Sequence, residues 1–291
     1  MQSPLPANVT CLRADNPSPM TGTGTNSYLI EGDQSCVLID PGPALPAHHR
    51  AIMAALAGRR LEAILITHAH LDHTALAPAV ADSTGAPVLA FGDALSGRSA
   101  VMATLAEQGM TGGGEGADLA FSPDVQLVNG QQIAFAGRVM EVLHTPGHMG
   151  GHLCFAFGDI LFSGDHVMGW STSLVSPPDG DMAAYRASLD LLSLRPWAQM
   201  LPGHGAPITQ PTARLAELTL HRRARETQVL TALADGPANA ASLAARIYTE
   251  SPAALLPAAA RNVLAHLVDL HARNLITTAN VITPHSHFQT I

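Results

Sequence analysis

The stretch ITHAHLDHTA, residues 66–75, places three imidazoles and a carboxylate within six positions, directly after an apolar run. That run, LEAILIT at residues 61–67, has the pattern of a buried strand that ends just before the first imidazole. Side chains at positions i and i+2 of extended backbone project to the same side, so His68 and His70 can converge on one point. The stretch therefore predicts a cluster of polar side chains at the end of a core strand.

The turn that follows supplies two further polar groups. Asp72 and His73 are expected to lie close to the same point, before a helix begins near Thr74. Imidazole nitrogen and carboxylate oxygen are ligands that Zn²⁺, Fe²⁺ and Mn²⁺ accept. Four such groups at a strand end would cost desolvation free energy unless a cation were present. The pattern therefore predicts a metal site.

Three later segments repeat this design of an apolar strand, a tight turn and a residue of metal-ligand type. They are LHTPGH, which ends at His148, FSGD, which ends at Asp165, and LPGHG, which contains His204. Loops at the ends of core strands are where a rigid scaffold carries chemistry. These segments therefore supply further residues of metal-ligand type, which we expect to lie near the first cluster.

Length and composition set the broad class. The 291 residues can bury a sizeable core and suit one large domain plus a small one. No apolar run approaches the roughly 18 residues of a membrane span, and the N-terminal MQSPLPANVT lacks the basic and apolar regions of a secretory signal. We therefore expect a cytoplasmic protein without a membrane partner. The three cysteines lack CxxC spacing, which predicts buried core residues.

The basic residues narrow the function further. All 15 are Arg, and the absence of Lys excludes a P-loop NTPase and a Lys Schiff-base enzyme. The net charge of −8 argues against general electrostatic attraction to nucleic acid. The charge is uneven, because residues 1–211 carry 8 Arg against 18 acidic residues, and residues 212–291 carry 7 Arg against 5. This asymmetry indicates two domains.

The order of the expected elements indicates an α/β protein with two parts. Strands are predicted at 9–14, 27–31, 36–39, 61–67, 87–91, 126–128, 133–135, 139–143, 152–157, 160–163 and 199–201. Helices are predicted at 45–57, 74–84, 94–108 and 181–194, and TGGGEG at 111–116 is expected to form a loop. From Pro211 the pattern is helical, at 211–234, 239–248 and 257–273, with a short strand at 275–278. We expect sheets packed face to face with helices outside, and domains at 1–210 and 211–291.

THAHLDH at residues 67–73, together with the three later segments, resembles the metallo-β-lactamase superfamily over residues 9–210. The resemblance implies a four-layer αββα sandwich and a dinuclear metal centre. Site 1 would consist of His68, His70 and His148, site 2 of Asp72, His73 and His204, and Asp165 would bridge the two ions. It implies two divalent metal ions, with Zn²⁺ as the first expectation and Fe or Mn as alternatives.

The implied activity is dinuclear metal-dependent hydrolysis, in which a metal-bridging hydroxide attacks an ester-type or phosphodiester centre. Asp72 would be the catalytic carboxylate that orients this nucleophile. Asp165 at the bridging position departs from β-lactamases proper, so at most weak β-lactamase activity is expected. A glyoxalase II-like thioesterase, which shares all seven ligands, and a mononuclear-iron persulfide dioxygenase, which shares HxHxDH, remain alternatives. The sequence leaves the substrate open.

A finer match concerns MTGTGTNSYLIEG at residues 20–32, which resembles the β-lactamase-like-protein-2 subfamily. Some members of that subfamily are endoribonucleases, and its chains end in a small winged-helix-like domain, which residues 215–280 fit. A small molecule or single-stranded RNA is therefore the expected substrate, and the C-terminal domain could also cap the site or form a homodimer. A non-enzymatic winged-helix nucleic-acid binder is a third hypothesis, against which the seven intact ligand positions argue.

For two groups of residues the sequence allows two different roles. The arginines of the C-terminal part either contact an anionic substrate or form a solvated helix face: Arg214, Arg222, Arg223 and Arg225. The histidines that flank the metal ligands either orient those ligands or are ordinary structural residues: His144, His152 and His166.

Overall fold

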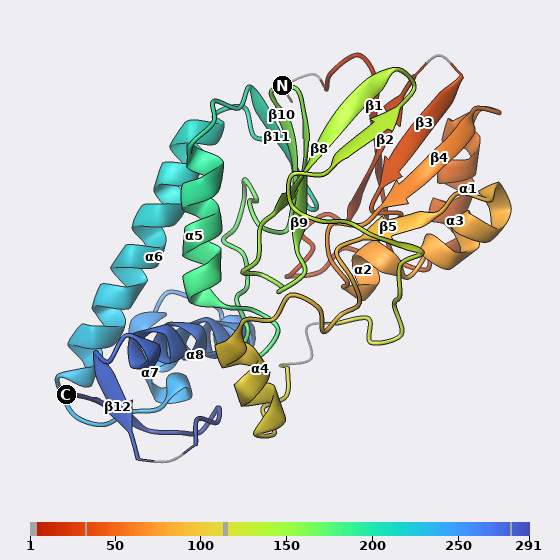
Figure 1. Cartoon of the computed structure of the whole chain (residues 1–291). Helices are drawn as coiled ribbons and strands as arrows, with labels where there is room; N and C mark the ends of the chain where they lie inside the picture. Colours follow the sequence, from red (N-terminus) through yellow and green to blue (C-terminus); the bar gives the residue numbers. More distant parts are fainter. Residues whose placement is uncertain (1–4, 33, 113–115, 280) are drawn as a thin grey trace.

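Two sheets stacked face to face form the centre of the molecule (Figure 1). The computed structural model describes residues 5–32, 34–112, 116–279 and 281–291, so part of the predicted loop at 111–116 and the first four residues lie outside the described residues. The first sheet has the strand order β1-β2-β3-β4-β5-β6. Its strands are β1 (Val9–Arg13), β2 (Asn26–Glu31), β3 (Ser35–Ile39), β4 (Arg60–Leu65), β5 (Val88–Ala90) and β6 (Val125–Gln126).

The second sheet has the order β11-β10-β9-β8-β7. Its strands are β7 (Gln132–Phe135), β8 (Arg138–His144), β9 (Leu153–Phe157), β10 (Ile160–Gly164) and β11 (Gln199–Pro202). Strands β8 and β10 are both antiparallel to β9, and β11 is parallel to β10. The carboxyl ends of β8, β10 and β11 therefore lie at one edge of the sheet, which is where the three predicted ligand loops follow them.

Helices cover both outer faces of the stacked sheets. Side chains such as Tyr28 and Leu65 of the first sheet pack against Phe155 and Phe162 of the second. The outer face of the first sheet is covered by α1 (Pro46–Leu56) and α3 (Ala77–Thr84), and that of the second by α5 (Met182–Ser193) and the first half of α6 (Pro211–Leu233). The predicted αββα sandwich is confirmed.

The first ligand motif begins its helix earlier than predicted. Helix α2 spans Leu71–Thr74, so Asp72 and His73 lie in the first helical turn rather than in a turn before it. The reason is that His70 keeps extended backbone, with φ −98° and ψ 145°, and serves as the N-cap of α2. A second helix, α3, then begins at Ala77 with Pro78 in its first turn, which suits a helix start.

The C-terminal part has a hydrophobic core of its own. The C-terminal part comprises the end of α6 with α7 (Ala240–Ile247), the 3₁₀ turn η1 (Ala253–Leu255), α8 (Leu256–Ala272) and the hairpin of β12 (Ile276–Thr278) and β13 (Phe288–Thr290). The sequence did not predict β13. It also did not predict that α4 (Ala100–Glu107) places Met102 and Leu105 in this core. Helix α6 contributes side chains to this core and to the core beneath the second sheet, so the domain boundary between residues 210 and 211 stays a proposal.

Residues Ala253–Ala272 meet the length and composition of a membrane span, with a mean hydropathy of 1.2. Half of this segment is buried inside the protein, and Val263, Leu264 and Leu267 are part of the C-terminal core. Packing therefore accounts for the apolar character of α8. The cysteines are free thiols, with Cys36 and Cys154 buried and Cys11 half-buried, which agrees with the predicted core role.

Candidate metal centre

The site 1 residues converge as the spacing predicted. The Nε2 atom of His68 lies 2.9 Å from Nδ1 of His70, and Nε2 of His148 lies 3.1 Å from the same atom. Two ligand nitrogens bound about 2.0 Å from one tetrahedral ion stand roughly 3.3 Å apart. The three imidazoles, all buried, therefore fit one divalent ion.

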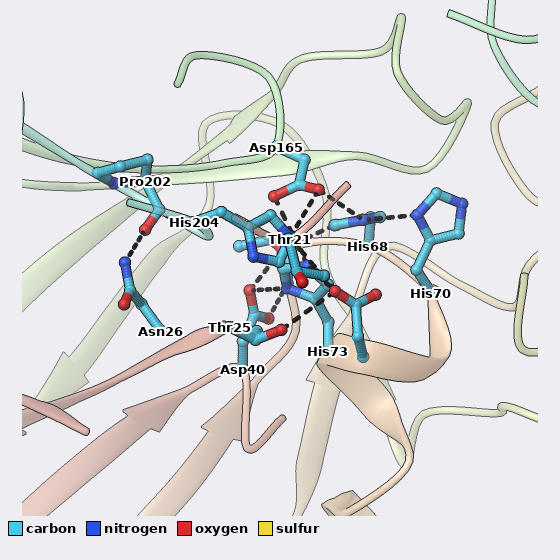
Figure 2. Close-up of polar contacts among 12 residues, drawn as sticks. Thr21, Thr25, Asn26, Asp40, His68, His70, His73, Asp165, Pro202 and His204 are labelled. Carbon is cyan, nitrogen blue, oxygen red and sulfur yellow. Dashed lines mark hydrogen bonds and ion pairs between the residues drawn. The ribbon is translucent and has the colours of Figure 1, made fainter. Parts of the chain in front are cut away.

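The site 2 residues form a second group around the carboxylate of Asp165 (Figure 2). His204 Nε2 lies 3.2 Å from Asp72 Oδ2 and 3.2 Å from Asp165 Oδ2. His73 Nε2 lies 3.5 Å from Asp72 Oδ2 and 3.6 Å from Asp165 Oδ1. On the other side, Asp165 Oδ2 lies 4.0 Å from His68 Nε2. The carboxylate of Asp165 thus stands between the two groups, as a bridging ligand would.

Two buried atoms at the centre of this arrangement have no hydrogen-bond partner. They are Nε2 of His73 and Oδ1 of Asp165. A buried polar atom without a partner is costly, and a bound cation would satisfy both atoms at once. The donor set of imidazole and carboxylate also suits a divalent ion. The residues therefore fit the two metal ions that the resemblance implied.

The two halves of the centre differ in electrostatics. Burial, together with the neighbouring His148, lowers the pKa of His70 to about 3, which keeps its ring neutral at neutral pH, as a metal ligand must be. Burial opposes charge on His204, but Asp165 and Asp72 outweigh it and raise the pKa of His204 to about 9. In the metal-free protein His204 and the carboxylates form buried ion pairs, which metal ions would replace.

Comparison with known proteins agrees with this geometry. Residues 20–204 match the family described as Metallo-beta-lactamase superfamily, and residues 240–280 match the Beta-lactamase associated winged helix domain. The chain belongs to the metallo-beta-lactamase superfamily. This membership confirms the predicted resemblance and fold class, and it supports the prediction of a metal-dependent hydrolase.

Individual relatives cover different shares of the chain. The chain is 30% identical to the Beta-lactamase-like protein 2 homolog of Drosophila melanogaster, over 91% of this chain and 88% of that protein. It is 31% identical to the Atrochrysone carboxyl ACP thioesterase of Aspergillus chevalieri, over 76% of this chain but only 64% of that protein's length. A crystal structure of a metallo-beta-lactamase family protein from Thermus thermophilus shares the fold, with a TM-score of 0.77 and 24% identity, over 97% of this chain and 98% of that one.

Within this metallo-beta-lactamase fold, Asp40 holds one of the candidate metal ligands, which was not predicted from the sequence. Its Oδ2 atom accepts a hydrogen bond from His73 Nδ1 at 2.8 Å, and its two oxygens accept the backbone N–H and the hydroxyl of Thr67. This carboxylate therefore fixes the ring of His73 with Nε2 toward the metals. The signal was present, because Asp40-Pro41-Gly42 follows an apolar strand just as the other ligand segments do.

Two other candidate ligand histidines are also held through their second nitrogen. Nδ1 of His148 donates to the carbonyl oxygen of Leu174 at 2.7 Å, and Nδ1 of His204 to that of Gly24 at 3.2 Å. Asn26 Nδ2 donates to the carbonyls on both sides of His204, at Pro202 (3.0 Å) and Gly205 (2.9 Å); Figure 2 shows the first of these contacts. Such contacts orient a ligand before an ion binds.

The flanking histidines separate into different roles. His152 orients a ligand, because its Nε2 accepts the backbone N–H of Asp165 at 3.2 Å while Nδ1 contacts Thr145 Oγ1 at 2.9 Å. His144 is structural, since it bonds to the Gly150 carbonyl and stacks on a phenylalanine. His166 is buried, and neither of its ring nitrogens has a hydrogen-bond partner. Only His152 therefore fits the predicted orienting role.

Gly203 leaves room for the centre. A Cβ atom at this position would lie 2.4 Å from Asp165 Oδ1 and 2.8 Å from His73 Cε1. Its backbone has no positive φ, so the requirement for glycine here is purely steric. The glycine in LPGH thus permits the backbone next to His204 to approach Asp165 and His73.

A cavity of about 820 Å³ opens beside the candidate metal ligands. Five of these residues line it: His70, Asp72, His148, Asp165 and His204. Its walls are largely apolar, with Met20, Leu71 and Trp170 each between 45% and 48% exposed. The far wall comes from the C-terminal part, at Tyr248, Leu255 and Ala258. The site is therefore a cleft between the sandwich loops and the C-terminal helices.

The arginines expected to form a cationic surface are largely engaged elsewhere. Arg222 is buried, so neither a substrate contact nor a solvated helix face describes it. Arg214 donates to the carbonyls of Met168 and Ser171, and Arg225 lies over the Tyr248 ring. Arg223 is exposed. Both interpretations are therefore wrong for Arg222, because the first half of α6 packs against the sandwich.

Proposed function

We propose that the chain is a dinuclear metal-dependent hydrolase of thioesters or related esters with an apolar acyl group. The observation that carries this proposal is a two-part ligand cluster at the base of a mainly apolar cleft. The reaction would convert a thioester and water into a carboxylic acid and a thiol. Metal ions bound at the centre would supply Lewis acidity and lower the pKa of a bound water toward 7.

Several residues of the chain would serve this reaction. Asp72 has the more exposed of the two ligand carboxylates, with 26% of its side chain exposed against 10% for Asp165. It also lines the cleft and accepts a hydrogen bond from Thr25 Oγ1 at 3.1 Å. These contacts support a role for Asp72 in orienting the attacking water and holding its proton. Asp40 would keep His73 in the tautomer that presents Nε2.

The charge of the cleft favours an ester over a phosphodiester. Among the described residues that line the cleft, Arg261 is the only Arg, and the chain has no Lys. The Arg261 guanidinium already donates to Ser176 Oγ at 2.8 Å and to backbone carbonyls of Thr111 and Pro177. A polyanionic strand would need a row of cations along its phosphates. The apolar walls instead suit an acyl group.

One curated relative agrees with this proposal. It is named as an acyl-carrier-protein thioesterase, and thioester hydrolysis agrees with the apolar cleft. Because the chain spans 64% of that protein, its substrate is not carried over. For this chain we propose hydrolysis of a thioester or related ester bond and an acyl group of apolar character.

A panel of thioesters tests the proposal. N-acetylcysteamine thioesters of acetate, hexanoate, decanoate and benzoate would be offered to Zn²⁺-, Fe²⁺- and Mn²⁺-loaded protein, beside bis-p-nitrophenyl phosphate and single-stranded RNA. We expect thioester turnover to exceed phosphodiester turnover and to disappear in His68→Ala and Asp165→Ala together with bound metal. Faster cleavage of RNA, or full activity in metal-free protein, would overturn the proposal.

A further inference from the structure

Among the described residues, Arg222 on α6 is one of the largest fully buried side chains, with 1% of its surface exposed. Its guanidinium donates to the Ser173 carbonyl and to Asn262 Oδ1, and its central carbon lies 4.8 Å from the ring centre of Tyr185. Within the described ranges, no carboxylate lies within ion-pair distance of it. A buried cation without a carboxylate is costly, so these neutral contacts must compensate for its lost hydration.

Asn262 on α8 connects this arginine to the loop that follows Asp165. Its Oδ1 atom accepts the backbone N–H of Val175 at 3.0 Å as well as the Arg222 contact at 3.3 Å. Both neighbours are donors, so the amide oxygen must face them. The side chain therefore ties α6, α8 and the loop together at one atom.

The peptide unit held by Asn262 is the one that holds a metal ligand. The N–H of Val175 and the carbonyl of Leu174 belong to the same peptide group, and that carbonyl accepts His148 Nδ1 at 2.7 Å. Donation through the N–H polarises the group and strengthens its carbonyl as an acceptor. It also fixes the plane of the group, and hence the direction from which His148 is held.

Ser173, the residue before this peptide group, contacts the backbone of the second candidate ligand, Asp165. Ser173 Oγ donates to the backbone carbonyl of Asp165, and it also lies 2.9 Å from that of His166. The carbonyl of Ser173 is the one that Arg222 binds. Residues 173–175 are thus held by the C-terminal helices on one side and contact two ligand-bearing segments on the other.

We propose that Arg222 and Asn262 are positioning residues of the metal centre, which act through residues 173–175 on His148 and Asp165. The C-terminal domain then does more than close the cleft: it sets the affinity of the centre for metal. The proposal rests on the metal centre of the proposed function but not on its substrate.

Variants at Asn262 separate positioning from other roles. Asn262→Leu removes the acceptor at similar size, Asn262→Asp keeps it, and Arg222→Met removes the cation. Arg223→Met, at an exposed cation on the same helix, is the matched control. The measurements are Zn²⁺ affinity by competition with a chromophoric chelator, and the visible absorption spectrum of the Co²⁺-loaded protein, which reports ligand geometry.

We expect Asn262→Leu to weaken metal binding about tenfold or more, as loss of a partner of a metal ligand commonly does, and to change the Co²⁺ spectrum. Asn262→Asp should keep the wild-type metal affinity and Co²⁺ spectrum. Arg222→Met should weaken metal binding, and Arg223→Met should match the wild type. A folded Asn262→Leu protein with wild-type affinity and spectrum would overturn the proposal. So would a change confined to KM, because Asn262 would then act on the substrate.

Wild-type protein provides a second test that does not depend on the folding of a variant. If Asn262 and the 173–175 segment favour metal binding, metal binding must equally stabilise their contacts. Hydrogen exchange at the Val175 amide should therefore slow on addition of Zn²⁺, while amides in α7 keep their rates. Unchanged exchange at Val175 would overturn the proposal. Absence of thioester turnover would defeat the proposed function but leave both of these measurements valid.

Discussion

Asp40 and His73 are joined by a 2.8 Å contact between Oδ2 and Nδ1, although they follow different strands of the first sheet. Because the other nitrogen of His73 faces Asp72 and Asp165, this contact decides which nitrogen is available to a metal ion. It is the outer half of a carboxylate–histidine–metal arrangement.

Asp40→Asn should therefore weaken binding of one metal ion roughly 10- to 100-fold, since the amide is a poorer partner for the His73 ring. The affinity for the second ion, which His68, His70 and His148 would hold, should fall less, because Asp40 reaches His68 only through the Thr67 hydroxyl. Metal stoichiometry and two-site competition titration measure this directly. Asp93→Asn, at an exposed aspartate away from the centre, is the control. Equal weakening at both sites would contradict the assignment of Asp40 to His73.

The metal-free protein should be most stable near pH 6.5. Two carboxylates raise the folded pKa of His204 to about 9, so the stability that His204 contributes is complete below its unfolded pKa and is lost as the pH rises toward 9. Burial lowers the folded pKa of His70 to about 3, so its neutral form stabilises the fold only above about pH 6.5. Chemical denaturation from pH 5 to 9 measures this dependence. A stability that rises steadily to pH 9 would contradict the ion pairs of His204.

Metal binding at neutral pH should release protons. His204 carries a proton below about pH 9 in the metal-free protein, and a metal ion must displace it. Calorimetric titration of Zn²⁺ at pH 7 in buffers with different ionisation enthalpies counts the protons released. The number should fall as the pH is raised through 9, and His204→Ala should release fewer. No buffer dependence at pH 7 would show that His204 is already neutral.

Gly203→Ala should abolish the assembled centre. The new Cβ would lie 2.4 Å from Asp165 Oδ1, so the carboxylate or the 202–205 loop must move. Gly169→Ala is a comparison with ordinary φ, where the new atom would lie 3.3 Å from Ile208 Cγ1 and 3.8 Å from the Ala206 carbonyl oxygen. Metal content after dialysis should fall for Gly203→Ala and stay at the wild-type value for Gly169→Ala. Full metal loading of Gly203→Ala would contradict the close approach.

The apolar wall of the cleft should set the length of the acyl group. Ala258 lines the cleft and is half-buried, so Ala258→Phe should raise KM for decanoyl thioesters more than for acetyl thioesters. Ala253 is exposed and does not line the cleft, which makes Ala253→Phe the matched control. Steady-state kinetics across the thioester series tests this. An equal effect on all chain lengths would place the acyl group elsewhere.

The sequence itself was sufficient for most of the fold and for the grouping of the candidate ligand residues at the ends of core strands. His68, His148, Asp165 and His204 each follow an apolar strand after a short turn, and both the strand and the turn are encoded locally by residue pattern. Asp40 obeys the same rule and was within reach of the same argument. The ends of the helices were predicted less accurately. The start of α2, for example, depends on the backbone of His70, which contacts the loop near Ala117.

The tertiary structure alone decided how the two parts of the chain meet. The Leu174 carbonyl that holds His148 has no side-chain signature, since every residue carries a carbonyl. Arg222 looks in sequence like one of several surface arginines, and only the packing of α6 against the sandwich buries it. Local pattern specifies what a segment becomes and where it ends, whereas contacts between distant segments depend on which faces pack together. The metal ligands belong to the first category, and the contacts that hold them from the C-terminal helices belong to the second.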